Sequence, residues 1–253
     1  MEKQSISEIR ACFQEADERE ENRLIRLFAE DERAGVRALV RKAEKHLEAL
    51  SEERKRLDRM RMYEHEYAGF GPVCGVDEAG RGPLAGPVVA GAVILPEDCE
   101  ILYLNDSKKL TPARREMLYD EIMEKAISVG VGIVGPVRID EINILQADYE
   151  AMCEALGQLT VMSATLLNDA VTIPQVKIRQ IPIIKGDAKS LSIAAASVIA
   201  KVTRDRIMDE YDDVYPEYGF AVHKGYGTAN HIAAIKKYGP TPIHRKTFIR
   251  KFV

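Results

Sequence analysis

Tryptophan is absent from this chain of 253 residues, so no site in it depends on indole stacking. An excess of positive charge is absent too, because 36 Lys and Arg stand against 40 Asp and Glu and the formal net charge is -4. The overall charge therefore gives no reason to expect binding to nucleic acid, and any basic surface has to be local.

Cysteine and long apolar runs are also scarce. No cysteine lies at metal-ligand spacing from another, and the set has no paired framework: Cys12, Cys74, Cys99 and Cys153. This usage is typical of reduced thiols in a reducing compartment. The longest apolar stretches, 88–95 and 193–200, are too short or too interrupted to span a bilayer, and the charged start at Glu2 lacks an apolar targeting segment. We expect a soluble, cytoplasmic protein with no membrane segment.

Glycine and proline are nearly missing from residues 1–68, where Gly35 stands alone among 15 Lys or Arg and 17 Asp or Glu. We therefore expect a helical, charge-rich N-terminal extension over 1–68 and a second domain over 69–253. Ser5 followed by Glu8 is typical of a capping box that opens a first helix. Residues 31–35 predict a break before a second helix.

One apolar stripe follows that break, with members alternately four and three residues apart: Val36, Val40, Ala43, Leu47, Leu50 and Leu57. This spacing predicts a long helix that ends near Tyr67. Packing of the helices within the chain, with a solvated charged face, accounts for the stripe. Two alternatives stay open: the helix docks on a protein partner, or its basic end contacts a polyanion through Arg54, Lys55, Arg56, Arg59 and Arg61.

Beyond Gly71 the pattern changes to alternating strands and helices. Strands are predicted at 73–76, 88–95, 129–134, 164–167 and 181–184, and helices at 112–125, 139–159, 190–211 and 228–238. Strands that come first and then alternate with helices indicate an α/β fold, in which helices cover a mixed sheet.

Acidic residues follow three of these predicted strands: Asp77 with Glu78, then Asp169, then Asp187. Active sites of open α/β sheets lie at such strand ends. Carboxylates gathered there would repel one another, and hard divalent cations such as Mg²⁺ remove that conflict. Two such ions can hold the attacking and the leaving oxygen of a phosphodiester. For a single Asp, a turn or helix cap is the alternative, and it applies most to Asp187.

A segment almost without side chains, Gly80-Arg81-Gly82, comes directly after the first two acids. Its spacing is wrong for a dinucleotide-binding fingerprint. A bare backbone can approach a sugar closely and hydrogen-bond a 2′-hydroxyl, the group that distinguishes RNA from DNA. A tight turn stiffened by Pro83 and Pro87 is the alternative, and both interpretations can hold together.

Several stretches together resemble the bacterial ribonuclease HII family, in the order in which that family carries them. They are Asp77-Glu-Ala-Gly-Arg-Gly-Pro-Leu-Ala-Gly-Pro-Val-Val89, Asn105-Asp-Ser-Lys-Lys-Leu110, Lys185-Gly-Asp-Ala-Lys-Ser190, Ala194-Ala-Ala-Ser-Val-Ile-Ala-Lys-Val-Thr-Arg-Asp205, His223-Lys-Gly-Tyr-Gly-Thr228 and Tyr238-Gly-Pro-Thr-Pro-Ile-His244. The resemblance runs from about Gly71 to Phe248.

This resemblance implies a ribonuclease H-like fold, with a mixed five-stranded sheet whose first three strands are antiparallel. It implies metal-dependent cleavage of the RNA strand in RNA–DNA hybrids. It further implies cutting on the 5′ side of a single ribonucleotide embedded in duplex DNA, which leaves 3′-hydroxyl and 5′-phosphate ends. Two Mg²⁺ or Mn²⁺ ions would be the cofactors, and protein partners are unknown.

The resemblance also implies residue roles. The metal-binding and catalytic carboxylates fall on Asp77, Glu78, Asp169 and Asp187. The loop that reads the 2′-hydroxyl falls on Gly80, Arg81 and Gly82, and the ring that packs on the adjacent sugar falls on Tyr226. Lys108 and Lys189 are expected phosphate contacts. No general base is needed, so His223 and His244 are expected to be structural or phosphate-side hydrogen bonders.

The chain departs from the family at one turn, where Asp-Gly is usual and this chain has Asn168-Asp169-Ala170. The acid is retained, but the glycine of the turn is not. The sister family, ribonuclease HIII, has Gly-Thr-Gly at the loop and a different N-terminal domain. Two rival functions stay open: a DNA-directed nuclease of the same fold, and a catalytically silent module that binds RNA–DNA hybrids.

Overall fold

The computed structural model describes residues 4–253, which fall into two compact units. The first unit ends at Asp58, and the second spans Arg59–Val253. Among residues 4–253, no helix is both long and apolar enough to cross a membrane.

The first unit is built from α1 (Ile6–Glu15), α2 (Glu18–Phe28) and most of α3 (Ala34–Met60). The Ser5 capping box is present, as predicted: the Glu8 N–H donates to Ser5 Oγ, and the Ser5 N–H donates to the Glu8 carboxylate. The start of a second helix at Asp17 was not predicted; the Asp17 side chain accepts from the Glu20 N–H and caps α2. It divides the expected first helix into two.

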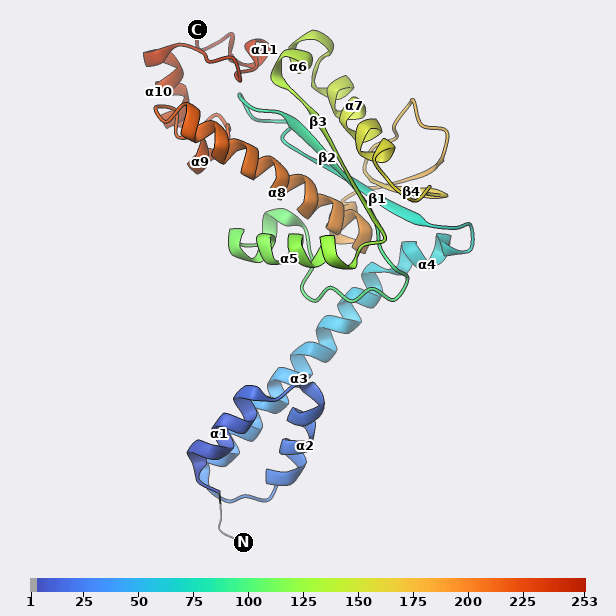
Figure 1. Cartoon of the computed structure of the whole chain (residues 1–253), viewed down its shortest axis with the longest axis vertical. Helices are drawn as coiled ribbons and strands as arrows, with labels where there is room; N and C mark the ends of the chain where they lie inside the picture. Colours follow the sequence, from blue (N-terminus) through green and yellow to red (C-terminus); the bar gives the residue numbers. More distant parts are fainter. Residues whose placement is uncertain (1–3) are drawn as a thin grey trace. The chain divides into compact units, whose positions relative to one another are not determined.

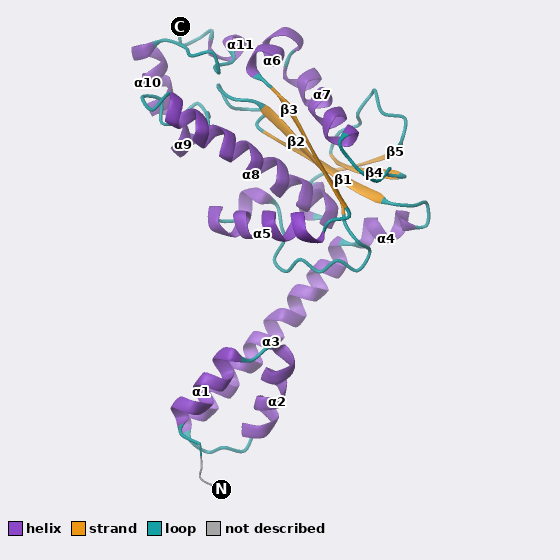
Figure 2. Cartoon of the chain, viewed as in Figure 1, coloured by secondary structure: helices purple, strands orange, loops and turns teal. Residues whose placement is uncertain are grey.

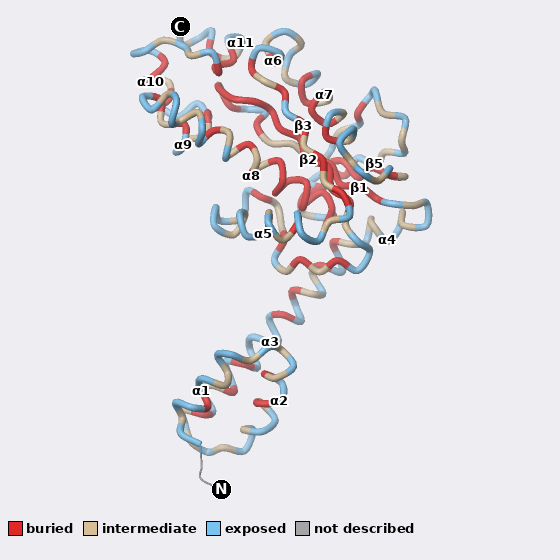
Figure 3. Tube along the Cα trace, in the orientation of Figure 1, coloured by how far each residue is buried: buried red, intermediate tan, exposed pale blue. Residues whose placement is uncertain are grey.

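The apolar stripe of α3 faces the interior of this unit. All of its members are buried except Leu47, which is half-buried (Figure 3). Val36 and Val40 pack with Ile9 of α1 in one cluster. Contacts within the chain therefore cover the stripe, and no partner is required to explain it.

Two details of the predicted helices were wrong. The break lies at residues 29–33, and Gly35 is already inside α3. The long helix does not run to Tyr67, because it ends at Met60 and a short helix, α4 (Met62–Ala68), follows Arg61.

The second unit contains one five-stranded sheet with the order β3-β2-β1-β4-β5 (Figure 2). The strands are β1 (Val73–Ala79), β2 (Val88–Ile94), β3 (Ser128–Val134), β4 (Thr165–Asp169) and β5 (Arg179–Ile183). The first three pair antiparallel, and β4 joins β1 and β5 in parallel. The predicted mixed sheet is confirmed.

Helices cover both faces of this sheet (Figure 1). On one face lie α8 (Leu191–Val214) and α5 (Pro112–Lys125); on the other lie α6 (Pro136–Ile142) and α7 (Ile144–Gly157). A Cβ on Gly75 would stand 2.1 Å from the Ser192 carbonyl carbon, so the bare strand lets α8 approach β1 closely. The predicted helix over 139–159 is divided at Asn143, whose φ of 67° ends α6 and whose side chain caps α7.

Short helices complete the unit: η1 (Ser107–Lys109), η2 (Gly186–Ala188), α9 (Phe220–His223), α10 (Ala229–Tyr238) and α11 (Lys246–Ile249). Phe220, Ile235 and Ile249 of the last three form a core cluster with Met208 of α8. This cluster fixes the C-terminal segments against the loop that leads from β1 to β2, where the bridge between Ala85 and His244 lies.

Candidate active site

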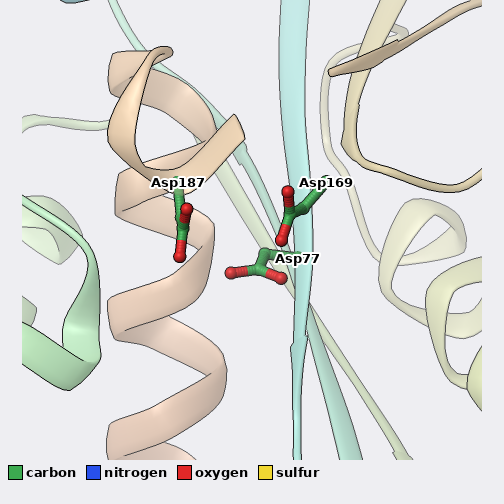
Figure 4. A group of neighbouring side chains, drawn as sticks. All are labelled: Asp77, Asp169 and Asp187. Atoms are coloured by element: carbon green, nitrogen blue, oxygen red, sulfur yellow. The ribbon is translucent and has the colours of Figure 1, made fainter. Parts of the chain in front are cut away.

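Three carboxylates that are far apart in the sequence converge at one end of the central strands (Figure 4). Asp77, Asp169 and Asp187 each place one oxygen within 4.8 Å of the others. Asp77 lies near the end of β1, Asp169 ends the neighbouring parallel strand β4, and Asp187 lies in η2 just after β5. Parallel pairing of β1 with β4 is what aligns the first two acids at the same edge.

Backbone hydrogen bonds fix two of these carboxylates. Asp77 Oδ1 accepts from the Glu78 N–H at 2.8 Å, and Asp169 Oδ1 accepts from the Gly186 N–H at 2.8 Å. The second bond ties β4 to η2 and so holds Asp187 beside Asp169. Contrary to the prediction, Asp77 and Glu78 do not follow β1 but belong to it, because the strand extends to Ala79 through its pairing with β2.

Glu78 stands next to the three aspartates without being one of the group. Its carboxylate lies 3.6 Å from the Arg81 guanidinium, measured from Oε1 to Nη1. Burial raises the pKa of Glu78; Arg81 opposes that shift and Asp169 adds to it. Glu78 thus shares the electrostatic environment of the cluster.

Burial and crowding make this cluster unfavourable for charge. Burial raises the pKa of Asp77 well above its usual range, and the neighbouring Glu78 and Asp169 raise it further. Burial also raises the pKa of Asp187, with Asp106 and Asp169 adding to the effect. A hard divalent cation would relieve this repulsion, and the all-oxygen donor set fits Mg²⁺ or Mn²⁺.

The two predicted lysines differ in their surroundings. Burial lowers the pKa of Lys108, but the carboxylates of Asp77, Asp106, Asp187 and Glu78 outweigh it, so the net shift is upward. Lys108 is therefore close enough to the acidic cluster to be affected by its charge. Lys189 is exposed, directly after η2.

Two buried arginines hold the carbonyl groups of the glycine-rich loop between β1 and β2. Arg245 donates to the Gly80 carbonyl at 2.6 Å and to the Arg81 carbonyl at 3.0 Å, and Arg204 donates to the Ala85 carbonyl at 3.2 Å. Both arginines also donate to the Pro87 carbonyl. Burial lowers the pKa of Arg245 to about 9, and Arg204 adds to that shift.

Gly80 is required where it stands. Its φ is 98°, and a Cβ there would lie 2.1 Å from Arg204 Nε. Any other residue would displace the guanidinium from the loop. The sequence analysis did not identify Arg204 or Arg245 as site residues, although Arg204 lies in one of the stretches that carry the resemblance.

Tyr226 lies beside the same loop, and the residue is 46% exposed. A Cβ on Gly82 would be 3.8 Å from Tyr226 Cε1, and Arg204 Cζ lies 6.0 Å from the ring centroid. The backbone of Tyr226 is held from behind, since its carbonyl accepts from the Thr228 N–H at 2.8 Å and pairs with His231 Nδ1 at 2.9 Å. The ring is therefore displayed at the surface and is no part of the core.

Comparisons with known proteins agree with this geometry. Residues 74–251 match the model of the ribonuclease HII family, and residues 5–68 match that of the ribonuclease HII N-terminal domain. The chain belongs to the ribonuclease HII family. It is 62% identical to the ribonuclease HII of Lachnoclostridium phytofermentans over 88% of each chain, and 49% identical to that of Clostridioides difficile over 100% of each.

Solved structures show the same relationship. The crystal structure of ribonuclease H2 from Pyrococcus horikoshii aligns with a TM-score of 0.60 and 33% identity, covering 72% of this chain and 96% of that one. As a member of the ribonuclease HII family, the chain is a ribonuclease H, a divalent-metal-dependent hydrolase of the endonuclease type.

The family match also bears on the N-terminal segment, which the sequence analysis set outside the catalytic core as an extension over 1–68. A family N-terminal domain covers 5–68. The compact unit of the structure ends earlier, at Asp58, so α4 lies inside the N-terminal match and inside the catalytic unit.

Asp148 of α7 is a further acid beside Arg81 of the glycine-rich loop, and the sequence analysis missed it. It is fully buried, and its Oδ2 lies 3.5 Å from Arg81 Nε. Neither carboxylate oxygen has a hydrogen-bond partner within the described residues. Burial raises the pKa of Asp148 to about 8, with Glu78 adding to the shift and Arg81 opposing it. The sequence did carry a signal for a buried acid, because Asp148 lies three and seven residues before the apolar Ala151 and Ala155, on the same face of a predicted helix.

The turn after Asp169, where this chain has Ala170 in place of the usual glycine, has the left-handed backbone conformation that glycine favours. Ala170 has a φ of 57°, and its N–H donates to the Ile183 carbonyl at 3.1 Å. Asp169 is therefore followed by a left-handed residue, and because that residue is an alanine its backbone is strained.

His223 and His244 each have a hydrogen-bond partner in the backbone. His223 pairs with the Tyr218 carbonyl, and His244 Nδ1 accepts from the Thr241 N–H.

Proposed function

We propose that this ribonuclease HII cleaves the RNA strand of RNA–DNA hybrids and cuts on the 5′ side of single ribonucleotides embedded in duplex DNA, leaving 3′-hydroxyl and 5′-phosphate ends. One observation carries the proposal. A largely buried carboxylate cluster, which includes Asp77, adjoins a loop whose carbonyl groups are fixed, and the exposed Tyr226 lies beside that loop.

Asp77, Asp169 and Asp187, with Glu78 beside them, are the residues that would hold two Mg²⁺ or Mn²⁺ ions. The convergence of the three aspartates and the raised pKa values of Asp77, Glu78 and Asp187 support this assignment. When bound, the ions supply Lewis-acid stabilisation of the phosphodiester and make a water more acidic. The carboxylates would position them, and Lys108, whose pKa the cluster raises, would contact the phosphate backbone.

Gly80, Arg81 and Gly82 would read the 2′-hydroxyl. The Gly80 and Arg81 carbonyls are held by Arg245, so the orientation of this backbone is set before substrate arrives. A site built to pair that hydroxyl rejects the analogue lacking it by roughly 10⁴-fold or more. The bare Cα of Gly82 allows close approach of a ribose, because a side chain there would fill the space next to Tyr226.

Tyr226 would pack on the sugar just after the ribonucleotide, and Lys189 would contact a phosphate at the other side of the cluster. The exposed ring supports the first role, and the exposed position beside η2 supports the second. A ring packed flat on a deoxyribose would favour DNA geometry on the 3′ side of the ribonucleotide.

The test is cleavage of duplex DNA carrying one ribonucleotide, with Mg²⁺, Mn²⁺ and EDTA in parallel. An all-DNA duplex and a long RNA–DNA hybrid serve as comparison substrates. A metal-dependent cut on the 5′ side of the ribonucleotide, with no cut in all-DNA duplex, is expected.

Other outcomes separate the rivals. Cleavage of the all-DNA duplex would show a DNA-directed nuclease. Activity on the long hybrid alone would retain the metal site and overturn the roles of Gly80, Arg81, Gly82 and Tyr226. Binding without cleavage of any substrate would show a silent hybrid-binding module.

A further inference from the structure

Glu64 of α4 makes three hydrogen bonds to the start of α8 through a single oxygen. Its Oε1 accepts from Ser190 Oγ at 2.6 Å, from the Ser192 N–H at 2.9 Å and from Ser192 Oγ at 2.7 Å. Ser190 is the N-cap residue of α8, and its Oγ accepts from the Ile193 N–H at 3.2 Å. Glu64 is thus part of the cap of a helix of 24 residues.

The arrangement is enforced by burial. Ser190 and Ser192 are both completely buried, so their hydroxyl groups and the Ser192 N–H depend on a protein acceptor. A carboxylate suits the place, because the first N–H groups of a helix lack partners within the helix and carry partial positive charge. Loss of Glu64 would leave buried donors unpaired and allow the first turn of α8 to shift.

A continuous series of hydrogen bonds leads from this cap to the proposed metal ligands. The Ser190 N–H donates to the Gly186 carbonyl at 2.8 Å, and the Gly186 N–H donates to Asp169 Oδ1 at 2.8 Å. Asp187 lies between these two anchored positions, within η2. A shift of Ser190 would therefore move both Asp169 and Asp187.

We propose that Glu64 is a positioning residue for the metal site, which acts through Ser190 and Ser192 on the segment that carries Asp187. This inference rests on the proposed metal-dependent function. It also gives the N-terminal match a role in catalysis, because α4 lies within residues 5–68 and ahead of the catalytic match at 74–251.

The experiment measures Mn²⁺ binding to the full-length protein by calorimetry, below the melting temperature of each variant. Glu64→Ala is expected to weaken Mn²⁺ binding about tenfold, the scale seen when a group that orients metal ligands is removed. Its activity should recover as Mn²⁺ is raised. Glu64→Gln keeps an acceptor oxygen and should bind Mn²⁺ within about threefold of wild type.

Glu66→Ala is the matched control, since it removes the same charge from an exposed position of α4 and should leave Mn²⁺ affinity unchanged. If Glu64→Ala does not fold, Ser192→Ala removes one of the three donors and should weaken Mn²⁺ binding about threefold. If the variant that folds, Glu64→Ala or Ser192→Ala, binds Mn²⁺ as tightly as the wild type, the inference is wrong. Failure of the wild-type protein to bind Mn²⁺ would overturn the proposed function instead.

Discussion

At the scale of single residues, Asp77 shows how position determines chemistry. It is nearly completely buried in β1, a strand residue that would normally be apolar. An unpaired charge there is costly, and Asp169 and Asp187 increase the repulsion. A site of this kind is stable as a charged cluster only with cations, and this requirement makes the residue sensitive to substitution.

Asp77→Asn is expected to lower turnover on the order of 10³-fold or more, because it removes a proposed metal ligand while it preserves shape. Hybrid binding should change by no more than a few-fold, since the loop and Tyr226 are untouched. Single-turnover cleavage and binding to a labelled hybrid check the two parts. An active Asp77→Asn enzyme would refute the metal assignment.

Tyr226→Ala is expected to lower activity at a single embedded ribonucleotide by about tenfold or more, because stacking of a ring on a nucleotide contributes roughly 1–3 kcal/mol. Tyr226→Phe keeps the ring and should retain most of the activity. Initial rates on the single-ribonucleotide duplex provide the measurement. Equal rates for the alanine variant and wild type would show that the exposed ring takes no part in recognition.

Ala170→Gly is expected to raise the free energy of unfolding by roughly 0.5–1 kcal/mol, because glycine removes the strain of a φ of 57° at an exposed turn. Chemical denaturation measures the change. Ala113→Gly, in the first turn of α5, is a control in the opposite direction, because glycine destabilises a helix. Equal or lower stability of Ala170→Gly would mean that the turn relaxes without cost.

At the scale of elements, a histidine pair links α10 to the turn before α11. His231 Nε2 and His244 Nε2 lie 3.0 Å apart, and both residues are buried. Because the Thr241 N–H donates to His244 Nδ1, His244 Nε2 carries the proton shared with His231, whose Nδ1–H then donates to the Tyr226 carbonyl. Every ring nitrogen is satisfied only in the neutral state.

The histidine pair predicts a loss of stability in acid. Burial lowers the pKa of His244 to about 4 from its ordinary value of 6.5, and His231 adds to that shift. Between pH 6.5 and about pH 4, His244 is protonated in the unfolded chain but stays neutral in the folded protein. The contribution of neutral His244 to folding stability is therefore complete above pH 6.5 and is lost as the pH falls toward 4.

His244→Gln should therefore reduce the decline of stability between pH 7 and pH 5, by about 1–2 kcal/mol, relative to wild type. Denaturation curves at several pH values provide the measurement. His65→Gln, at an exposed position of α4, should leave the decline unchanged. A decline of equal steepness in His244→Gln would assign it to other groups.

At the scale of the whole molecule, the basic end of α3 bears on whether the N-terminal unit contacts nucleic acid. Arg54 pairs with Glu18, Lys55 with Glu52 and Arg56 with Glu53. These cations are balanced within the unit, which leaves little reason for them to bind phosphates. The net charge of -4 agrees with a local, not global, attraction to nucleic acid.

A triple variant, Arg54→Gln with Lys55→Gln and Arg56→Gln, should leave the slope of log affinity against log salt unchanged. Lys108→Gln should reduce that slope by about 0.9, the value for one lost phosphate contact on a duplex. Hybrid binding between roughly 50 and 200 mM salt provides the measurement. A smaller slope in the triple variant would restore a phosphate-binding role for the N-terminal unit.

Local pattern was sufficient for much of the fold. The limits of α5 were predicted at Pro112 and Lys125 from helical periodicity alone, and the structure shows that Thr111 caps the first turn. The split at Asn143 escaped prediction, because helical periodicity continues across it and only the backbone turns. The end of β1 was misplaced for a related reason: its pairing with β2 extends the strand through two acids that have no strand propensity.

By itself, the sequence determined the kind of chemistry. Oxygen ligands and a bare backbone loop are properties of residue types, and those can be read along the chain. Only the tertiary structure decided how they are held. Three contacts show this: Asp77, Asp169 and Asp187 converge, Arg245 donates to the Gly80 carbonyl, and Glu64 caps α8. Each of them joins residues from separate elements of the fold. Such contacts depend on strand pairing and packing, which no local pattern specifies.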